Sequence, residues 1–183
     1  MQPLAERLRP KTLDEYIGQK HLVGPGAILR KMIDAGRISS FILWGPPGVG
    51  KTTLAQIIAN KLETPFYTLS AVTSGVKDVR EVIERAKSNR FFSQASPILF
   101  IDEINCVSET LAPTMLQFLQ CKTFGNQAVP EGWVIVAAGN PPEYNKSVRE
   151  FDLVTLDRVR RIDVEPKLSV WQDYARAHRL HPA

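Results

Sequence analysis

The sequence predicts an α/β fold built on a central, mainly parallel sheet. Short apolar runs alternate along the chain with stretches of helical periodicity, which is the pattern of strand-helix-strand units. One such run leads into a helix through a glycine-rich turn, GPPGVGKTT at 45–53. A continuous apolar run, PILFI at 97–101, is typical of a strand covered on both faces. A parallel sheet with helices on both sides accounts for all three observations.

The composition is that of one globular domain. The chain has 183 residues, of which 44% are hydrophobic and 23% charged, which excludes disorder, collagen-like repeats and a long coiled coil. Two cysteines, Cys106 and Cys121, are too few for a disulfide scaffold or a Cys-rich zinc module. The start, MQPLAERLRP, has charges where a signal peptide needs an apolar run, and no apolar stretch approaches the roughly 18 residues of a spanning helix. We therefore expect a cytoplasmic protein without membrane contact.

Positive charge is concentrated at the N-terminal end of the chain. The formal net charge is +4. Residues 1–50 hold seven Lys or Arg and four Asp or Glu, so this stretch alone contributes +3. Such a bias permits a polyanionic partner such as a nucleotide or nucleic acid, but it does not by itself indicate DNA binding.

The elements of the first half follow from turn residues and periodicity. Residues 1–26 are rich in Pro and Gly and are expected to form a linker. A helix is expected over 27–35, closed by the glycine that follows it. The apolar run FILW at 41–44 predicts a strand, and the amphipathic stretch 51–62 predicts a helix. PFYTL at 65–69 predicts a second strand.

The second half continues the alternation. Apolar residues at helical spacing predict a helix over 76–89, before the strand at 97–101. The remaining expected elements are a helix at 107–120, a hairpin turn at 124–127, strands at 133–139 and 160–164, and a helix that starts at 168 and ends by 179. The five expected strands are enough for one central sheet.

The glycine-rich turn is the first motif that indicates chemistry. It fits the pattern G-x-x-x-x-G-K-[ST] and lies between an expected strand and an expected helix, as a phosphate-binding loop does. Lys51 would offer its charge to the β- and γ-phosphates, and Thr52 its hydroxyl to Mg²⁺. The alternative is a structural turn that matches by chance. The residues expected to bind nucleotide here are Gly45, Pro46, Pro47, Gly48, Val49, Gly50, Lys51, Thr52 and Thr53.

Three further positions complete the expected site. ILFIDE at 98–103 ends a strand on two carboxylates, where Asp102 would hold Mg²⁺ through its water shell and Glu103 would polarise the attacking water. Asn140 follows the strand WVIVAAG and would orient the water or contact the γ-phosphate, or it merely starts a turn. Arg158 would reach the γ-phosphate of a neighbouring subunit, or it forms a local ion pair with Asp157, Asp163 or Glu165.

Taken together, GPPGVGKTT, ILFIDE, Asn140 and Arg158 resemble the nucleotide-binding core of AAA+ ATPases, which are P-loop NTPases with an αβα sandwich. Through about residue 104, the segments LAERLRPKTLDEYIGQKHLVGPG, SSFILWGPPGVGKTTLAQIIA and LSAVTSGVKDVREVIERAK resemble the RarA/MgsA family, which is linked to replication and recombination. In that family the segment matching YIGQ lies against the adenine. The resemblance therefore implies an adenine contact for Tyr16 and Ile17.

After residue 104 the chain resembles the MoxR-like branch of AAA+ proteins instead. There FGNQAVPEG would be the hairpin before sensor 1, Asn140 sensor 1 and Arg158 the arginine finger. We therefore expect a mosaic joined within ILFIDEI at 98–104, whether engineered, natural or a sequence joined at a shared motif. We also expect a division into a linker with the adenine-contacting segment (1–26), a nucleotide-binding core (27–166) and the start of a largely absent helical lid (167–183).

The resemblance also implies partners. These are ATP or ADP with Mg²⁺, a homo-oligomeric ring (hexameric in MoxR-like and tetrameric in RarA-like proteins), and a client that is either single-stranded or forked DNA or another protein. The leading hypothesis is Mg²⁺-dependent ATP hydrolysis. The alternative is a nucleotide-binding module that does not turn over.

Overall fold

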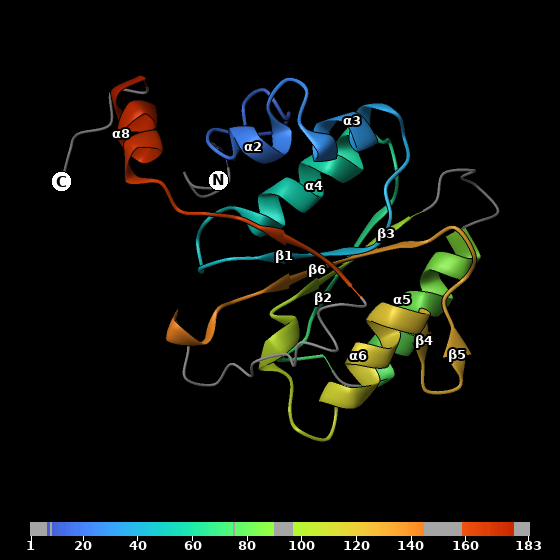
Figure 1. Ribbon diagram of the computed structural model, residues 1–183. Helices are drawn as coiled ribbons and strands as arrows, with labels where there is room; N and C mark the ends of the chain where they lie inside the picture. The colour runs from blue at the N-terminus through green and yellow to red at the C-terminus, as the bar shows by residue number, and fades with distance from the viewer. Residues whose placement is uncertain (1–6, 8, 75, 90–96, 145–158, 178–183) are drawn as a thin grey trace.

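The computed structural model describes residues 7, 9–74, 76–89, 97–144 and 159–177. Within them lies the expected central sheet (Figure 1), in the order β2-β3-β6-β1-β7, and each of its four pairings is parallel. The strands are β1 (Phe41–Trp44), β2 (Phe66–Ser70), β3 (Ile98–Asp102), β6 (Val134–Gly139) and β7 (Arg160–Asp163). In a parallel sheet all strands end at the same edge, so the segments that follow β1, β3 and β6 meet there.

Helices cover both faces of the sheet, which confirms the predicted αβα sandwich (Figure 1). One face carries α2 (Lys20–Val23), α3 (Ile28–Asp34) and α4 (Lys51–Lys61). The other carries α5 (Val76–Asn89), α6 (Ala112–Cys121) and the hairpin of β4 (Thr123–Phe124) and β5 (Gln127–Ala128). Single 3-10 turns follow β3 (Ile104–Cys106) and β6 (Pro142–Tyr144), and α8 (Leu168–Ala177) extends beyond the sheet after β7. No helix in the described ranges combines the length and apolarity needed to cross a membrane.

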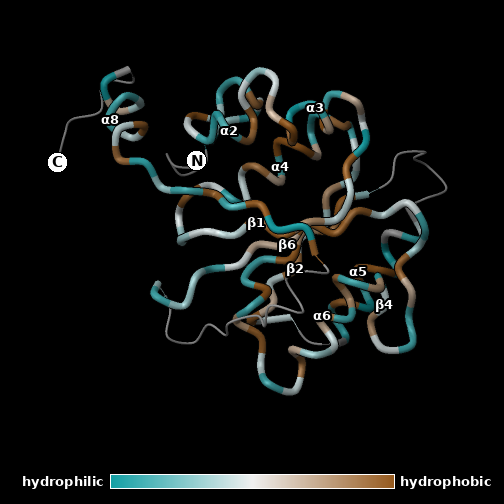
Figure 2. Tube along the Cα trace, in the orientation of Figure 1, coloured by the Kyte–Doolittle hydropathy of each residue, from teal (hydrophilic) through white to brown (hydrophobic). Residues whose placement is uncertain are grey.

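Alternation along each strand divides the core into two clusters, one on each side of the sheet. In β1, Ile42 and Trp44 pack on the α5–α6 side, whereas Phe41 and Leu43 pack on the α4 side. Every residue of β1 is buried, which explains why the apolar runs in the sequence are continuous (Figure 2). The core also crosses the position of the expected join, since Tyr67 of β2 stacks on Trp133, with ring centroids 6.1 Å apart.

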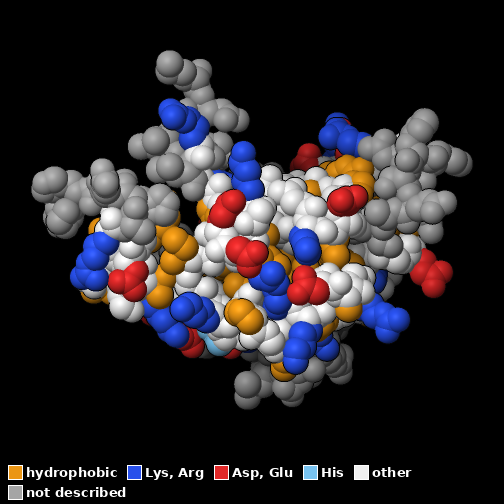
Figure 3. All heavy atoms as spheres, turned by 90° about the horizontal axis from the view of Figure 1, so that it is seen from above, with side chains coloured by type: hydrophobic (Ala, Val, Ile, Leu, Met, Phe, Trp, Pro, Cys, Tyr) orange, Lys and Arg blue, Asp and Glu red, His pale blue; other side chains and the backbone are white. Residues whose placement is uncertain are grey.

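The surface above α2, α3 and α4 carries charges of both signs. In Figure 3, Lys and Arg side chains are interspersed with Asp and Glu on this face. Arg30 is one example, because its guanidinium lies 2.9 Å from Asp14 and 3.2 Å from Asp34. Such exposed pairs contribute little to stability, and this face presents no patch of a single sign.

The predicted helix at 107–120 is wrong at its start. The chain leaves β3 through the 3-10 turn at 104–106, and α6 begins only at Ala112. Pro113 explains the difference, because proline lacks a backbone N–H and its ring clashes with the preceding turn of a helix interior. It is tolerated in the first turn, which is where the structure places it.

The N-terminal stretch contributes to the core, which the sequence patterns did not show. The one-turn helix α2 was not predicted. Leu13, Tyr16 and Val23 are buried in the same cluster as the apolar face of α4. This packing fixes the chain ahead of β1 against the loop and helix that follow β1.

The difference between buried and exposed positions predicts a contrast between two isoleucines. Ile42 is fully buried in β1, whereas Ile28 at the start of α3 is 78% exposed. Ile42→Ala is expected to lower the free energy of unfolding by about 2–5 kcal/mol, because it removes buried methyl groups and leaves a cavity. Ile28→Ala should change it by about 0.5 kcal/mol or less. Urea unfolding of both variants measures the difference, and equal losses would contradict the assigned core.

Candidate functional site

Backbone geometry explains the glycines of the loop at 45–53. Gly50 caps α4 with φ of 92°, a left-handed conformation that other residues rarely adopt. A Cβ on Gly45 would lie 2.1 Å from the carbonyl oxygen of Val164, the residue after β7. Only glycine therefore allows the backbone at the end of β7 to approach the loop so closely. The loop therefore turns tightly from β1 into the N-terminus of α4, where backbone N–H groups favour a bound anion.

Lys51 is buried at the start of α4, and its ammonium is fully paired. Its Nζ donates hydrogen bonds to the carbonyl oxygens of Gly45 at 2.6 Å and Pro46 at 2.7 Å, and to Oδ1 of Asn140 at 2.8 Å. Burial lowers the pKa of Lys51, and the carboxylates of Asp102 and Glu103 oppose that shift. A phosphate that binds here must exchange with at least one of the three acceptors.

The carboxylates at the end of β3 face the start of α4. The hydroxyl of Thr52 lies 3.3 Å from Oδ2 of Asp102, and the other oxygen of Asp102 accepts the backbone N–H of Glu103 at 3.1 Å. Glu103 has φ of 54° and turns the chain out of the strand into the 3-10 helix. Burial and these two carboxylates raise the pKa of the nearby Cys106 thiol, so this cysteine remains protonated near neutral pH.

The donor set here fits Mg²⁺ in the way that nucleotide sites do. Thr52 and Asp102 present hard oxygen atoms within hydrogen-bond distance of each other. The described residues include no cluster of three or more His, Cys, Asp or Glu that would form a complete protein cage. Mg²⁺ needs no such cage, because it is commonly bound by one or two protein oxygens, substrate phosphates and water.

A cavity of about 310 Å³ brings most of the expected residues together. It is formed by the loop, the start of α4 and the ends of β3 and β6. Its lining residues are Arg9, Pro47, Gly48, Gly50, Lys51, Thr52, Thr53, Asp102, Glu103 and Asn140. Only Arg9 was not expected from the sequence. It belongs to the N-terminal stretch and adds a second cationic side chain to a cavity that already contains Lys51.

Asn140 lies where the sequence placed it, at the end of a strand beside the one that ends in Asp102. Its side chain accepts the hydrogen bond from Lys51, and its backbone is held by a second asparagine. Asn105 donates from Nδ2 to the carbonyl oxygen of Asn140 at 2.7 Å and accepts its N–H at 3.1 Å. Sequence analysis missed Asn105, because a single Asn after a strand has no spacing that distinguishes it from a turn residue.

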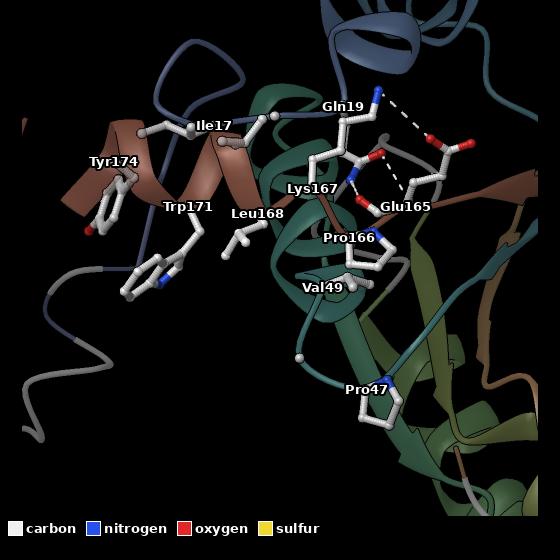
Figure 4. Close-up of a pocket in the computed structure, with 13 residues that line it drawn as sticks. Ile17, Gln19, Pro47, Val49, Glu165, Pro166, Lys167, Leu168, Trp171 and Tyr174 are labelled. Atoms are coloured by element: carbon white, nitrogen blue, oxygen red, sulfur yellow. Dashed lines mark hydrogen bonds and ion pairs between the residues drawn. The ribbon is translucent and has the colours of Figure 1, made fainter. Parts of the chain in front are cut away.

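An apolar pocket of about 510 Å³ adjoins the loop (Figure 4). The loop contributes Pro47 and Val49, and α8 contributes several side chains. Figure 4 shows Trp171 and Leu168 extending from the same side of that helix. The lining residues are Ile17, Gly18, Gln19, Pro47, Gly48, Val49, Glu165, Pro166, Lys167, Leu168, Val170, Trp171 and Tyr174. A pocket with apolar and aromatic walls beside a phosphate-binding loop is suited to a flat heterocycle.

The structure separates the two residues expected to contact adenine. Ile17 is 43% exposed and lines the apolar pocket. Tyr16 is buried behind the loop instead, where its hydroxyl lies 3.3 Å from the carbonyl oxygens of both Val49 and Gly50. Tyr16 therefore supports the loop through its hydroxyl, and of these two residues only Ile17 lines the apolar pocket.

A pair of hydrogen bonds joins the two segments that form this pocket. Gln19 donates from Nε2 to the carbonyl oxygen of Glu165 at 2.5 Å and accepts the N–H of Glu165 at 3.2 Å (Figure 4). Next to it, Gly18 leaves room for Val170 of α8, because a Cβ there would lie 3.0 Å from the valine methyl. The hydrogen bonds between Gln19 and Glu165 join positions 146 residues apart, so no local sequence pattern predicts them.

Arg158 lies outside the described residues, so its expected role stays a prediction. Two of the acidic residues considered as its ion-pair partners are engaged elsewhere. Asp163 lies 2.7 Å from Arg161, whose guanidinium also lies 5.0 Å from the centre of the Trp44 ring. Glu165 lies 3.7 Å from Lys167.

Comparisons with known proteins agree with this geometry. The family described as "ATPase family associated with various cellular activities (AAA)" matches residues 41–159. The chain is similar to Replication-associated recombination protein A of Haemophilus influenzae, with 48% identity over 118 residues, or 64% of this chain and 26% of that protein. The protein of the same name from Escherichia coli K12 is 48% identical over 119 residues, or 65% and 26%. The match thus spans about a quarter of these relatives.

Solved structures with a similar fold include RuvB of Thermotoga maritima. One RuvB variant gives a TM-score of 0.67 at 25% identity, covering 95% of this chain and 55% of that one. Another, described as a Holliday junction branch migration motor, gives 0.63 at 25% identity, covering 94% and 54%. The fold is a P-loop AAA fold like that of RuvB, with a central parallel sheet of five strands.

The position of Tyr16 predicts a pH dependence of stability. Burial raises its pKa from 10.0 to about 12, so the native state keeps the phenolic proton to higher pH than the unfolded chain does. The stability from this difference is fully present below pH 10 and is lost as the pH rises through 12. Tyr16→Phe should remove this component, which is on the order of 2 to 3 kcal/mol.

Urea unfolding across that alkaline range provides the measurement. Tyr144→Phe is the matched control, because Tyr144 is exposed and should leave the pH profile of the wild type unchanged. Parallel profiles for the wild type and Tyr16→Phe would contradict the buried, protonated hydroxyl.

Proposed function

We propose that this chain, which belongs to the AAA family of ATPases, binds ATP and hydrolyses its terminal phosphate. The observation that carries the proposal is the cavity at the carboxyl edge of the sheet. There Lys51, Thr52, Asp102, Glu103 and Asn140 from three separate elements line one space of about 310 Å³. A buried cation, a metal-binding oxygen pair and a second carboxylate are the groups that phosphoryl transfer to water requires.

Each residue has a role that follows from its surroundings. Lys51 would pair with the β- and γ-phosphates, and Thr52 and Asp102 would hold Mg²⁺, which neutralises phosphate charge when bound. Glu103 would accept a proton from the attacking water. Asn140 would contact the γ-phosphate or orient that water, since its side chain already lies 2.8 Å from Lys51.

The apolar pocket beside the loop is proposed as the adenine site for ATP and ADP. Ile17 and Val49 would lie against the base, and Trp171 of α8 would contribute an aromatic wall. Tyr16 would act indirectly, because its hydroxyl hydrogen-bonds to carbonyl oxygens of the loop and holds the loop in position. The remaining loop positions other than the two prolines would surround the phosphates with backbone N–H groups.

We propose a homo-oligomeric ring as the working assembly. In it Arg158 would reach the γ-phosphate bound by a neighbouring subunit and stabilise the charge that develops during hydrolysis. The division into an N-terminal segment (1–26), a core (27–166) and the start of a lid (167–183) is part of the same proposal.

We also propose that the chain is a mosaic of a RarA-like and a MoxR-like sequence. The matches to recombination proteins extend over 118 and 119 residues, or 64% and 65% of this chain, so they do not cover all of it. The features that resemble MoxR-like proteins are the hairpin of β4 and β5 and Asn140 after β6. In this proposal a RarA-like half supplies the loop and a MoxR-like half supplies the sensor strand.

Two substitutions test nucleotide binding and turnover separately. Lys51→Ala is expected to weaken ATP binding at least tenfold, which corresponds to about 1.4 kcal/mol. Lys61→Ala, on the exposed end of the same helix, is the matched control and should bind normally. Glu103→Gln should keep binding but lower the hydrolysis rate by roughly 10²–10⁴-fold.

Isothermal titration with Mg·ATP and a phosphate-release assay give the two readouts. Unchanged affinity in Lys51→Ala would overturn the phosphate site. Equal, background-level hydrolysis by the wild type and Glu103→Gln, with binding intact, would identify a nucleotide-binding module without turnover.

As the client of this activity we propose single-stranded or forked DNA, rather than a protein. The proposal is supported by the relatives, one group named for replication-associated recombination and another described as a branch migration motor. The mixed charges in Figure 3 do not identify a DNA-binding face.

Fluorescence anisotropy with a labelled fork, and with an unbranched duplex of equal length as control, tests the DNA proposal. We expect preference for the fork and an affinity that falls as salt rises, with a logarithmic slope of about −0.7 to −0.9 per phosphate contact. An absence of binding to either DNA at low salt would favour a protein client.

A further inference from the structure

The ends of β3 and β6 are joined by a side chain rather than by the sheet. Pairing of the two strands ends at Ile101 and Ala137, three residues before Asn140. Beyond that point the amide of Asn105 makes both hydrogen bonds to the backbone of Asn140, at 2.7 and 3.1 Å. Asn105 is 1% exposed, so no water replaces these bonds if its side chain is removed.

Asn105 also closes a buried network that reaches the loop. It holds the backbone of Asn140, whose Oδ1 accepts from Lys51 at 2.8 Å. The backbone carbonyl of Glu103 accepts the N–H of Cys106 at 2.8 Å, so Asn105 and Glu103 share one tight 3-10 turn. The network therefore links the turn that carries Glu103 to the lysine of the 45–53 loop.

The three acceptors of Lys51 differ in how easily they can be exchanged. Two are backbone carbonyls of the loop, whereas the third is the side-chain oxygen of Asn140. A phosphate that accepts one hydrogen bond from Lys51 displaces the side-chain acceptor most readily, because a side chain can rotate while the loop stays in place. The freed amide of Asn140 can then turn toward the phosphate or the water.

We propose that Asn105 is a positioning residue for nucleotide turnover, which holds the backbone of Asn140 fixed while its side chain exchanges Lys51 for phosphate. The inference rests on the proposed function of the same cavity and deepens it. Asn105 touches neither nucleotide nor water in this role. It acts through Asn140, and it keeps Asn140 in register with Glu103.

Steady-state hydrolysis and ADP binding in matched variants test the inference. Asn105→Ala is expected to lower kcat roughly 10- to 100-fold while the Kd for ADP changes less than threefold. Asn60→Ala, at an exposed position on α4, is the control and should leave both unchanged. Asn105→Ser introduces no charge and keeps one hydroxyl that can donate or accept a hydrogen bond, so its kcat should fall between those of the wild type and Asn105→Ala.

A double-mutant cycle separates positioning from simple stabilisation. If Asn105 acts through Asn140, adding Asn105→Ala to Asn140→Ala should lower kcat by less than twofold beyond the loss from Asn140→Ala alone. Chemical unfolding gives the folded fraction, to which each kcat is normalised. Should Asn105→Ala lose its cooperative transition, the same cycle with Asn105→Ser provides the answer.

Two results would overturn the inference by itself: a wild-type kcat in the Asn105 variants, or losses that multiply in the double variant. A wild-type chain that binds Mg·ATP without hydrolysing it would overturn the proposed hydrolysis, and this inference with it. The wild-type control thus distinguishes the two failures.

Discussion

The burial of one ammonium group at the head of α4 is the constraint on which the site depends. A buried cation is costly unless it is paired, and Lys51 is paired three times, by two loop carbonyls and Asn140. The loop must curl back to present those carbonyls, which is why its glycines adopt conformations and approaches that other residues cannot. The end of β6 must also lie beside β1, and the strand order places it there.

Two chemically different cavities adjoin the 45–53 loop at this edge of the sheet. On one side of the loop lie charged and hydrogen-bonding groups at the ends of β3 and β6, and on the other lies an apolar pocket completed by α8. Tyr16 and the pair formed by Gln19 and Glu165 tie the N-terminal stretch to both the loop and the entry to α8. A ligand with a charged tail and a flat apolar head matches this division, and ATP has both parts.

The sequence predicted the features that depend on interactions between residues close together in the chain. The strands of the sheet, the loop at 45–53 and the carboxylates after β3 follow from apolar runs and short-range spacing, and all appear within a residue or so of their expected bounds. The start of α6 was wrong although its cause, Pro113, is also local and was overlooked. Asn105 and the Gln19–Glu165 pair could not be predicted, because their partners lie 35 and 146 residues away and no periodicity links them.

The proposed join between two sequence types falls in β3, an interior strand of the sheet. The pairing of β3 with β2 and β6 is made by backbone groups that any sequence supplies. The side chains that must agree across the join lie in both core clusters, and they include the stack of Tyr67 on Trp133. Asn105 and Asn140 both lie after the join and hold each other, whereas Lys51 lies before it. In a mosaic, the hydrogen bond from Lys51 to Asn140 would therefore join a residue of one lineage to a residue of the other within a single phosphate site.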